Sequence, residues 1–260
     1  MHEGGLLIIL IAGLLGALIG SFLNVCIYRL PRQESIVWPG SHCPRCAQPI
    51  AWYDNIPILS YLALAGRCRY CTAPISFRYP AVELLNAAGY VGVVWIFGLN
   101  GIAVTYGFLY SALLVAAGTD LSHKIIPNAL TFPGIILGLV CATTILPLGF
   151  LGSVLGVFVG GGILWVLAWA SPYLFGKEGM GGGDIKLMAM IGAFLGWKPA
   201  LITIMIGSFL GSLVGVTLMA AQVIKREEYI PFGPFLVCGA LVALFFGQPI
   251  LDWYQGLLAG

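Results

Sequence analysis

Long apolar runs separated by short polar turns make up most of the chain. A helix needs about 20 mostly apolar residues to cross a bilayer, so each run predicts a membrane-spanning helix. We expect about eight such helices, which makes the fold that of an all-α polytopic membrane protein. The sixth run is short and also fits a re-entrant segment. The expected spans are residues 6–28, 80–97, 102–119, 129–146, 150–173, 184–197, 199–223 and 232–254.

One sizeable polar stretch, residues 29–79, follows the first apolar run directly. The sequence therefore predicts three parts. Residues 1–28 form the first span, residues 29–79 form a cytoplasmic loop, and residues 80–260 form the membrane-embedded core. No Lys or Arg precedes the first run, as one would in a cleavable signal peptide, so we expect this span to be retained.

Composition supports a membrane protein and excludes nucleic-acid binding. Of the 260 residues, 60% are hydrophobic and 8% are charged, and the mean hydropathy is +0.98. Soluble domains carry about 25% charged residues, so membrane lipid is the expected surrounding of this chain. The net charge of +2 rests on too few basic residues to form a phosphate-binding stripe. We therefore expect no nucleic-acid partner.

The basic residues predict which side of the membrane each loop faces. An even number of spans places both termini on one side, and Lys and Arg gather in cytoplasmic loops. In the expected topology Lys198 alone lies on the side of the termini, so both termini are predicted to lie outside the cytoplasm. The opposite, cytoplasmic face holds Arg29, Arg32, Arg45, Arg67, Arg69, Arg78, Lys124, Lys177, Lys186, Lys225 and Arg226.

Two acidic residues lie at span ends on this cytoplasmic edge. Asp184 follows the glycine-rich segment 179–183, and Asp120 closes the apolar run 103–119. An ionisable group at the edge of a membrane span disfavours insertion, so we expect these two acids to form a functional pair. The structural alternatives are helix capping or ion pairs, such as Asp120 with Lys124 and Asp184 with Lys186.

Two neighbouring carboxylates can hydrolyse a peptide bond. Like charges repel, so the two groups share one proton: one carboxylate activates a water while the other protonates the carbonyl oxygen. The glycines before Asp184 would let an extended substrate approach the backbone closely. A proton-coupled carrier is the alternative function for this pair, although its relay acids are expected nearer the bilayer midplane.

Four cysteines in the loop 29–79 form two CxxC pairs, Cys43 with Cys46 and Cys68 with Cys71. This spacing is typical of a tetrahedral zinc site with four thiolate ligands. Redox pairs or disulfides, as in a membrane thiol oxidoreductase, are the alternative, but a cytoplasmic loop is kept reduced. The remaining cysteines lie in apolar runs and are expected to be core residues: Cys26, Cys141 and Cys238.

Glycines repeat every fourth residue in three of the expected spans. This small-xxx-small spacing lets two membrane helices approach closely, so it predicts helix-packing faces. The repeats are Gly16 and Gly20, then Gly152, Gly156 and Gly160, and finally Gly207, Gly211 and Gly215.

Motifs along most of the chain closely resemble those of the type IV prepilin peptidases. The sequence Gly181-Gly182-Gly183-Asp184 fits the GxGD pattern of intramembrane aspartyl proteases. The cysteine loop distinguishes the chain from presenilin-like GxGD enzymes. The resemblance runs from about Gly20 to Gly233 and includes the segments 20–25, 28–31, 55–57, 60–62, 66–68, 76–83, 179–187 and 192–197.

The resemblance implies a bifunctional enzyme of the bacterial inner membrane. Such an enzyme cuts the leader of prepilins and pseudopilins on the cytoplasmic side and then methylates the new amino terminus with S-adenosylmethionine. Pilus assembly or type II secretion is the implied process. The identity of the pilin substrate and the oligomeric state are not predicted by the sequence.

The resemblance also assigns site residues, by matching positions of this sequence to the family's motifs. The resemblance implies that Asp120 and Asp184 are the catalytic pair and that the four loop cysteines bind zinc. One departure is Asn128, where many family members have Asp, and we interpret it as a turn or cap residue. Expected substrate-binding residues are Gly181, Gly183 and Lys186.

The position of S-adenosylmethionine is harder to predict. No glycine-rich Rossmann turn is present, so the cofactor would lie against the loop and the neighbouring spans. The expected cofactor-binding residues are Gly66, Glu83 and Asn24. For Glu83, an interhelical hydrogen bond or an ion pair with Arg78 is an equally good explanation.

Overall fold

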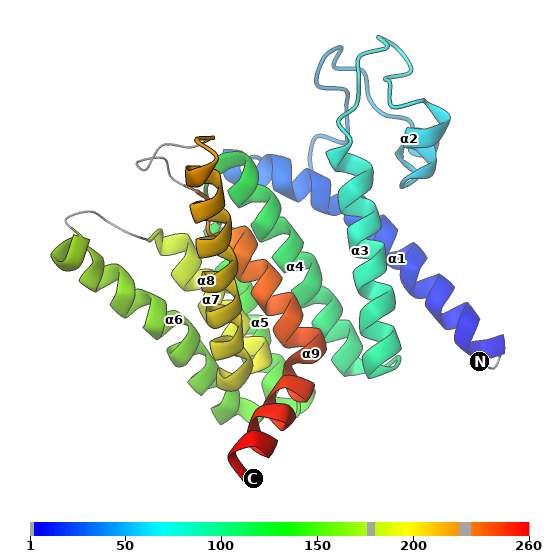
Figure 1. Cartoon of the computed structure of the whole chain (residues 1–260). Helices are drawn as coiled ribbons and strands as arrows, with labels where there is room; N and C mark the ends of the chain where they lie inside the picture. Colours follow the sequence, from blue (N-terminus) through cyan, green and yellow to red (C-terminus); the bar gives the residue numbers. More distant parts are fainter. Residues whose placement is uncertain (1–2, 176–179, 224–229, 260) are drawn as a thin grey trace. The chain divides into compact units, whose positions relative to one another are not determined.

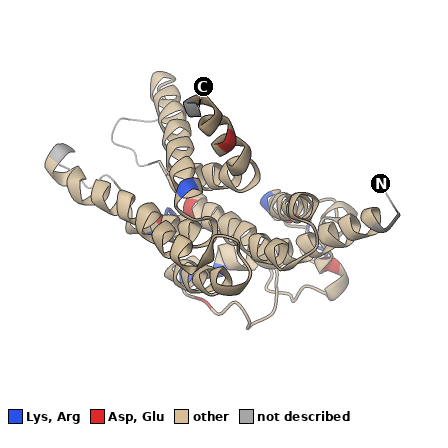
Figure 2. Cartoon of the chain, turned by 90° about the horizontal axis from the view of Figure 1, so that it is seen from below, with Lys and Arg blue, Asp and Glu red and all other residues tan. Residues whose placement is uncertain are grey.

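The computed structural model describes residues 3–175, 180–223 and 230–259, and helices dominate it (Figure 1). Charged residues are sparse along these helices, as the apolar composition requires (Figure 2). Four residues used in the sequence analysis lie outside the described part of the chain: Lys177, Gly179, Lys225 and Arg226.

Each of the eight predicted spans corresponds to one apolar helix, which confirms the all-α polytopic fold. Three short helices lie in the loop between the first and second apolar helices: η1 (Leu30–Arg32), η2 (Trp52–Asn55) and α2 (Leu59–Ala63). The apolar helices are α1 (Glu3–Arg29), α3 (Arg78–Phe97), α4 (Gly101–His123), α5 (Asn128–Thr144), α6 (Gly149–Phe175), α7 (Gly182–Leu195), α8 (Trp197–Ala220) and α9 (Gly233–Ala259).

Helix length separates two of these elements from the rest. Among the described residues, six helices are long and apolar enough to cross a bilayer. The exceptions are α5, with 17 residues, and α7, with 14 residues. At 1.5 Å per residue α7 is about 21 Å long, shorter than the hydrocarbon thickness of about 30 Å. The short length predicted for the sixth run is therefore confirmed.

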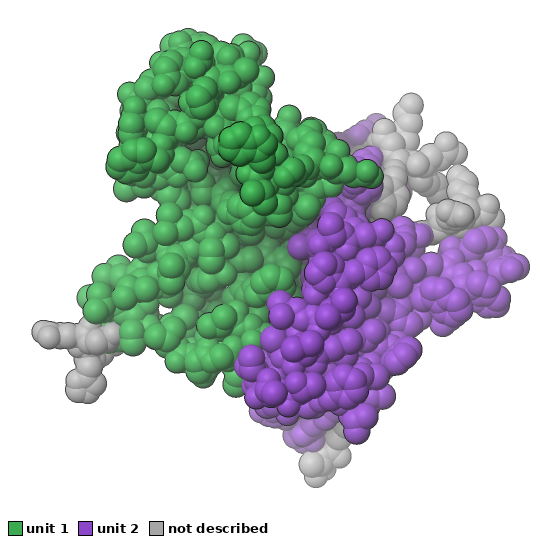
Figure 3. Space-filling model, turned by 180° about the vertical axis from the view of Figure 1, so that it is seen from behind, with its two compact units in different colours: residues 1–115 green, residues 116–260 purple. Residues whose placement is uncertain are grey.

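The chain divides into two compact units, residues Met1–Val115 and Ala116–Gly260 (Figure 3). The boundary falls within α4, so its first part belongs to the amino-terminal unit and its last two turns belong to the carboxy-terminal unit. This division reflects which residues pack together. The division predicted from the sequence, into residues 1–28, 29–79 and 80–260, reflects the pattern of polar residues, and it stays a prediction.

In the amino-terminal unit α1 packs against α3 through the predicted glycine face. A Cβ atom at Gly20 would lie 2.7 Å from the Cα atom of Glu83, so a larger residue does not fit there. The buried Asn86 side chain donates a hydrogen bond of 2.7 Å to the backbone carbonyl of Gly16. It also accepts one of 3.0 Å from the Ser111 hydroxyl, on α4. Close backbone approach and buried polar contacts together hold these helices.

In the carboxy-terminal unit α7 is the central helix and contacts α5, α6, α8 and α9. Its closest approach is to α6, where Gly156 faces Gly192. A Cβ atom at either glycine would overlap the carbonyl oxygen of the other. A Cβ atom at Gly160 would similarly lie 2.6 Å from the Met188 carbonyl oxygen. These glycines let α6 cover α7 along its length, and residues 187–194 are consequently buried.

The other predicted glycine faces are formed to different extents. Gly207 lies against Leu236 of α9, with 3.2 Å between that side chain and a Cβ atom built on the glycine. The atoms nearest to a Cβ built on Gly152 belong to Leu148, a residue of the preceding turn of chain, and not to a neighbouring helix. Helix ends also depend on glycine: α3 stops at Gly98 and α7 at Gly196, both with a positive φ, of 74° and 83°, which residues with a Cβ atom rarely adopt.

The contact between α6 and α7 predicts a steric effect that can be measured. Gly192→Ala places a methyl group against the Gly156 backbone, so the helices must separate. We expect the free energy of unfolding to fall by about 1–3 kcal/mol, seen as a lower Tm in detergent. Gly162→Ala is the matched control on α6, because no heavy atom lies within 4 Å of its added Cβ. Equal melting temperatures for the two variants would contradict this account.

Candidate functional site

Asp120 and Asp184 line the same cavity of about 230 Å³ in the carboxy-terminal unit. Asp120 lies in the last turn of α4 and Asp184 is the third residue of α7. Each is only 3% exposed. The expected meeting of the two acids at helix ends is thus seen in the structure, and burial of both makes a solvated capping role a poor explanation.

The start of α7 places Asp184. The helix begins after Gly181, and the Asp184 amide donates a hydrogen bond of 3.2 Å to the Gly181 carbonyl. A carboxylate in the first turn of a helix is favoured by the helix dipole. Gly183 is closely packed, because a Cβ atom there would lie 3.1 Å from Ile126, nearer than an ordinary contact. Gly182 has open space around it, so the two glycines are not equivalent.

Asp120 is held by a group that the sequence analysis did not identify. Its Oδ2 atom accepts a hydrogen bond of 2.8 Å from the backbone N–H of Gly233, at the start of α9. The first amides of a helix have no partner within the helix, so this donor is available. A Cβ atom at Gly233 would lie 2.7 Å from the same oxygen. The Gly-Pro pair at 233–234 marks a helix start, but nothing local in it points to Asp120.

The predicted substrate-binding residues separate into two groups. Gly181 and Gly183 line the cavity with the two acids. Lys186 does not: its Nζ atom donates a hydrogen bond of 2.8 Å to Asn128 and lies 5.5 Å from the centre of the Phe132 ring. Asn128 is the first residue of α5, and its side chain binds Lys186 instead of capping the helix.

Four cysteines of the loop between α1 and α3 form a cluster that could hold a metal ion. The Sγ atoms of Cys43, Cys46, Cys68 and Cys71 all lie within 4.8 Å of one another. The Sγ atoms of Cys43 and Cys71 are 3.8 Å apart, and those of Cys46 and Cys68 are 4.0 Å apart. Ligands about 2.3 Å from a tetrahedral zinc ion are about 3.8 Å apart, so the cluster fits four-thiolate coordination.

The two CxxC segments have the same backbone structure, which we call the first knuckle (residues 41–50) and the second knuckle (residues 66–75). In each knuckle the amide of the first cysteine donates a hydrogen bond to the carbonyl five residues later. The bond from Cys43 to Gln48 is 2.9 Å long, and the bond from Cys68 to Ala73 is 2.8 Å long. Both segments read Cys-x-x-Cys-x-x-Pro-Ile. This repeat could have been found in the sequence, and it shows that the loop is built from two equivalent halves.

The clustered thiols do not ionise equally. A backbone N–H group, that of Cys46, donates to the Cys43 sulfur and lowers the pKa of this thiol to about 6, whereas desolvation and the neighbouring sulfurs raise the pKa of Cys46 to about 11. The thiolate is the form that binds metal, so Cys43 reaches its ligand state at a lower pH than Cys46. A bidentate contact between Arg69 and Asp54, with distances of 2.6 and 2.7 Å, joins the second knuckle to η2 and lowers the pKa of Asp54.

The predicted cofactor-binding residues lie at two places in the amino-terminal unit. Asn24 and Glu83 lie in the interface between α1 and α3. The Asn24 amide donates to the Tyr79 carbonyl over 3.1 Å, and Glu83 accepts 2.8 Å from the Ile58 amide. Gly66 instead belongs to the second knuckle, where its carbonyl accepts from Ile75 over 2.7 Å. Packing of the knuckle thus accounts for Gly66.

Comparisons with known proteins agree with these features. Residues 14–97 match the bacterial peptidase A24 N-terminal domain, and residues 107–216 match the type IV leader peptidase family. No solved structure is significantly similar to the chain.

Three relatives carry the name prepilin leader peptidase/N-methyltransferase. The relative from Xanthomonas campestris pv. campestris is 39% identical over 263 residues, which cover 92% of this chain and 92% of the relative. The relative from Pseudomonas aeruginosa is 37% identical over 266 residues, covering 93% and 91%. The relative from Burkholderia pseudomallei is 35% identical over 260 residues, covering 90% and 84%.

Proposed function

Because the chain belongs to the type IV leader peptidase family, we propose that it is a membrane endopeptidase that removes the leader of type IV prepilins and pseudopilins. The observation that carries the proposal is the pair of buried carboxylates, Asp120 and Asp184, on one cavity. The same enzyme then methylates the new amino terminus. Pilus assembly or type II secretion is the process it serves.

Cleavage uses the two acids as a dyad. Two carboxylates in one buried cavity resist double ionisation, since like charges repel strongly where water is scarce. The ionised member takes a proton from water as that water attacks the peptide carbonyl, and the protonated member donates to the carbonyl oxygen. Collapse of the tetrahedral intermediate breaks the C–N bond, and the nitrogen takes up a proton. Gly181 and Gly183 leave room for the substrate backbone beside the acids.

Methyl transfer and metal binding belong to the amino-terminal unit. S-Adenosylmethionine, when bound, supplies a methyl group to the new terminal amine, which loses a proton and leaves S-adenosylhomocysteine as the second product. Zinc is the metal we assign to the cysteine cluster, because four thiolates at these distances match its preferred tetrahedral geometry. Convergence of all four sulfurs on one point favours a metal site over an oxidoreductase that works through separate disulfides.

We assign the enzyme to the bacterial inner membrane, with the cysteine loop and both acids on the cytoplasmic side. The bias of Lys and Arg toward these loops supports this orientation. A cysteine introduced at Ser122, in a variant without native thiols, should react with an impermeant reagent from the cytoplasmic side. A cysteine at Asn100 should react from the opposite side. The reverse labelling pattern would overturn the orientation.

The dyad predicts that each acid is indispensable. Asp120→Asn and Asp184→Asn should each lower the rate of prepilin cleavage by about 100- to 10,000-fold, because one amide cannot replace the missing base or acid. Asp252→Asn, at an exposed position of α9, is the matched control and should cleave normally. Mass spectrometry of the peptide products gives the rates. Near-normal cleavage by either dyad variant would remove that residue from the mechanism.

Gly233 is predicted to be a positioning residue for cleavage. Gly233→Ala would push a methyl group against the Asp120 carboxylate, and a displacement of about 1 Å can lower a rate about 100-fold. Gly247→Ala on the same helix has nothing within 4 Å of its added Cβ and should be harmless. The kcat of cleavage should fall in the first variant while the Tm stays close to that of the control. A normal kcat would show that the contact with Asp120 is dispensable.

The cysteine loop is predicted to affect methylation more than cleavage. Cys43→Ser and Cys71→Ser each leave three thiolates, and structural zinc contributes on the order of 10 kcal/mol to folding of its site. Bound zinc and N-methylated product should both disappear, whereas cleavage falls less. Cys238→Ser, outside the cluster, is the control for thiol removal. Equal losses of the two products would make the loop a general scaffold and withdraw its assignment to methyl transfer.

A further inference from the structure

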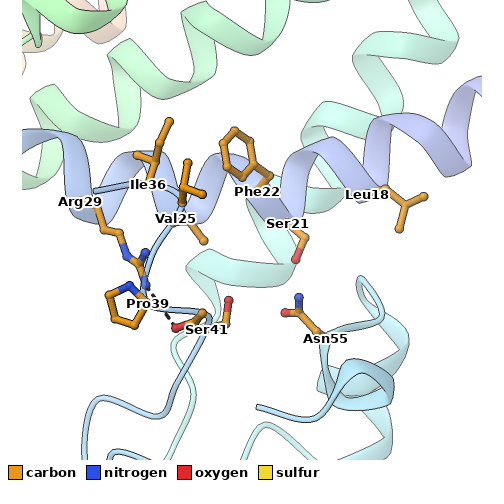
Figure 4. A pocket seen from close by; sticks show the side chains of 11 residues that line it. Leu18, Ser21, Phe22, Val25, Arg29, Ile36, Pro39, Ser41 and Asn55 are labelled. Atoms are coloured by element: carbon orange, nitrogen blue, oxygen red, sulfur yellow. Dashed lines mark hydrogen bonds between the residues drawn. The ribbon is translucent and has the colours of Figure 1, made fainter. Parts of the chain in front are cut away.

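A second cavity, of about 240 Å³, lies in the amino-terminal unit between α1 and the loop that follows it (Figure 4). Polar side chains reach into it from both sides. Ser21 and Arg29 come from α1, and Ser41 and Asn55 come from the loop. The rest of the wall is apolar, with Phe22 among its members. An apolar hollow with a few converging polar groups is the usual form of a small-molecule site.

Arg29, at one end of this cavity, is a buried cation, only 7% exposed. Its guanidinium donates to the carbonyls of Ser35, over 2.9 Å, and Gly40, over 3.4 Å. A guanidinium has five N–H groups, so further donors remain for a ligand. Within the described part of the chain it forms no ion pair. A buried charge is normally paired, so an anionic ligand group would complete this end.

A buried carboxylate adjoins the other end. Glu83 is 7% exposed and lies close enough to the Ser21 hydroxyl to interact with it. It also forms no ion pair among the residues that the structure describes. Its Oε2 atom accepts a hydrogen bond from Ile58, which has φ of 63° and ψ of −51°. A β-branched residue rarely adopts this conformation, and such strain clusters at functional sites.

From these observations we propose that this cavity binds S-adenosylmethionine. The inference rests on the methyl transfer assigned above and gives it a place in the molecule. The ligand carries a carboxylate at one end, ribose hydroxyls near its middle and a planar heteroaromatic base at the other end. The cavity offers a cation at one end, hydroxyl and amide groups toward the other, and apolar side chains along the rest of its wall. Glu83 is not part of the lining and contacts Ser21 from behind.

Dimensions are compatible with this assignment. Ser21 and Arg29 are eight residues apart on α1, which corresponds to about 12 Å along the helix. The part of an extended S-adenosylmethionine molecule between its carboxylate and its ribose hydroxyls fits within this spacing, and the base extends beyond it. Arg29 then binds the carboxylate of the ligand in the paired geometry that guanidinium groups favour. Ser21 and Asn55 bind the ribose hydroxyls, and Glu83 acts through Ser21, whose hydroxyl it contacts.

Direct binding tests the proposal without relying on methylation. Equilibrium dialysis of the purified full chain in detergent against radiolabelled S-adenosylmethionine measures the affinity. Asn55→Leu removes a ligand contact from the loop, and Ser21→Val removes one from α1. We expect each change to raise Kd about tenfold or more, through loss of a hydrogen bond in a partly buried site. Gln48→Leu, an exposed amide of the same loop, is the matched control and should bind normally.

Bound zinc and Tm report whether each variant is folded. The two substitutions lie on different elements, so if one variant fails to fold, the other still tests the site. Normal affinity in folded Asn55→Leu and Ser21→Val proteins would overturn this cavity as the binding site and leave methyl transfer intact. If the unaltered chain cleaves prepilin but binds no S-adenosylmethionine, both this site and the assigned methyl transfer fail, while the peptidase function stands.

Discussion

The backbone contact between Gly156 of α6 and Gly192 of α7 is the constraint on which the proposed cleavage site depends. It allows a 14-residue helix, too short to span a bilayer, to be covered on its sides by its neighbours. Asp184 lies in the first turn of that helix. Its position is therefore determined by helix packing, while Asp120 is fixed separately by the amide of Gly233.

Two kinds of stabilisation support the two proposed chemistries. The acids depend on close packing of apolar helices, where each contact is short and few side chains can be exchanged. The loop between α1 and α3 has little apolar core, and a metal held by four sulfurs would replace that core. This difference would let one chain carry both the proposed hydrolytic site, held by helix packing, and a separate module whose order depends on the proposed metal ion.

The sequence predicted the helices, the two acids and the metal cluster, because each follows from a local pattern. Apolar runs of sufficient length specify spans, and CxxC spacing specifies thiolate ligands. Contacts between distant segments had no such signal. Nothing near Gly233 indicates that its amide meets Asp120. Lys186 was expected at the substrate because it follows Asp184 in the motif, and its partner Asn128, 58 residues away, has no local signal. The orientation in the membrane and the site roles remain predictions.

The two knuckles have a further consequence for how the loop assembles. Each knuckle closes its own backbone hydrogen bonds, from Cys43 to Gln48 and from Cys68 to Ala73, and these bonds do not involve the other half. A metal ion bound by two sulfurs from each knuckle would therefore join two turns that are already formed. When a chelator removes the metal, the two knuckles would separate from each other first. The local turn within each knuckle would be lost later.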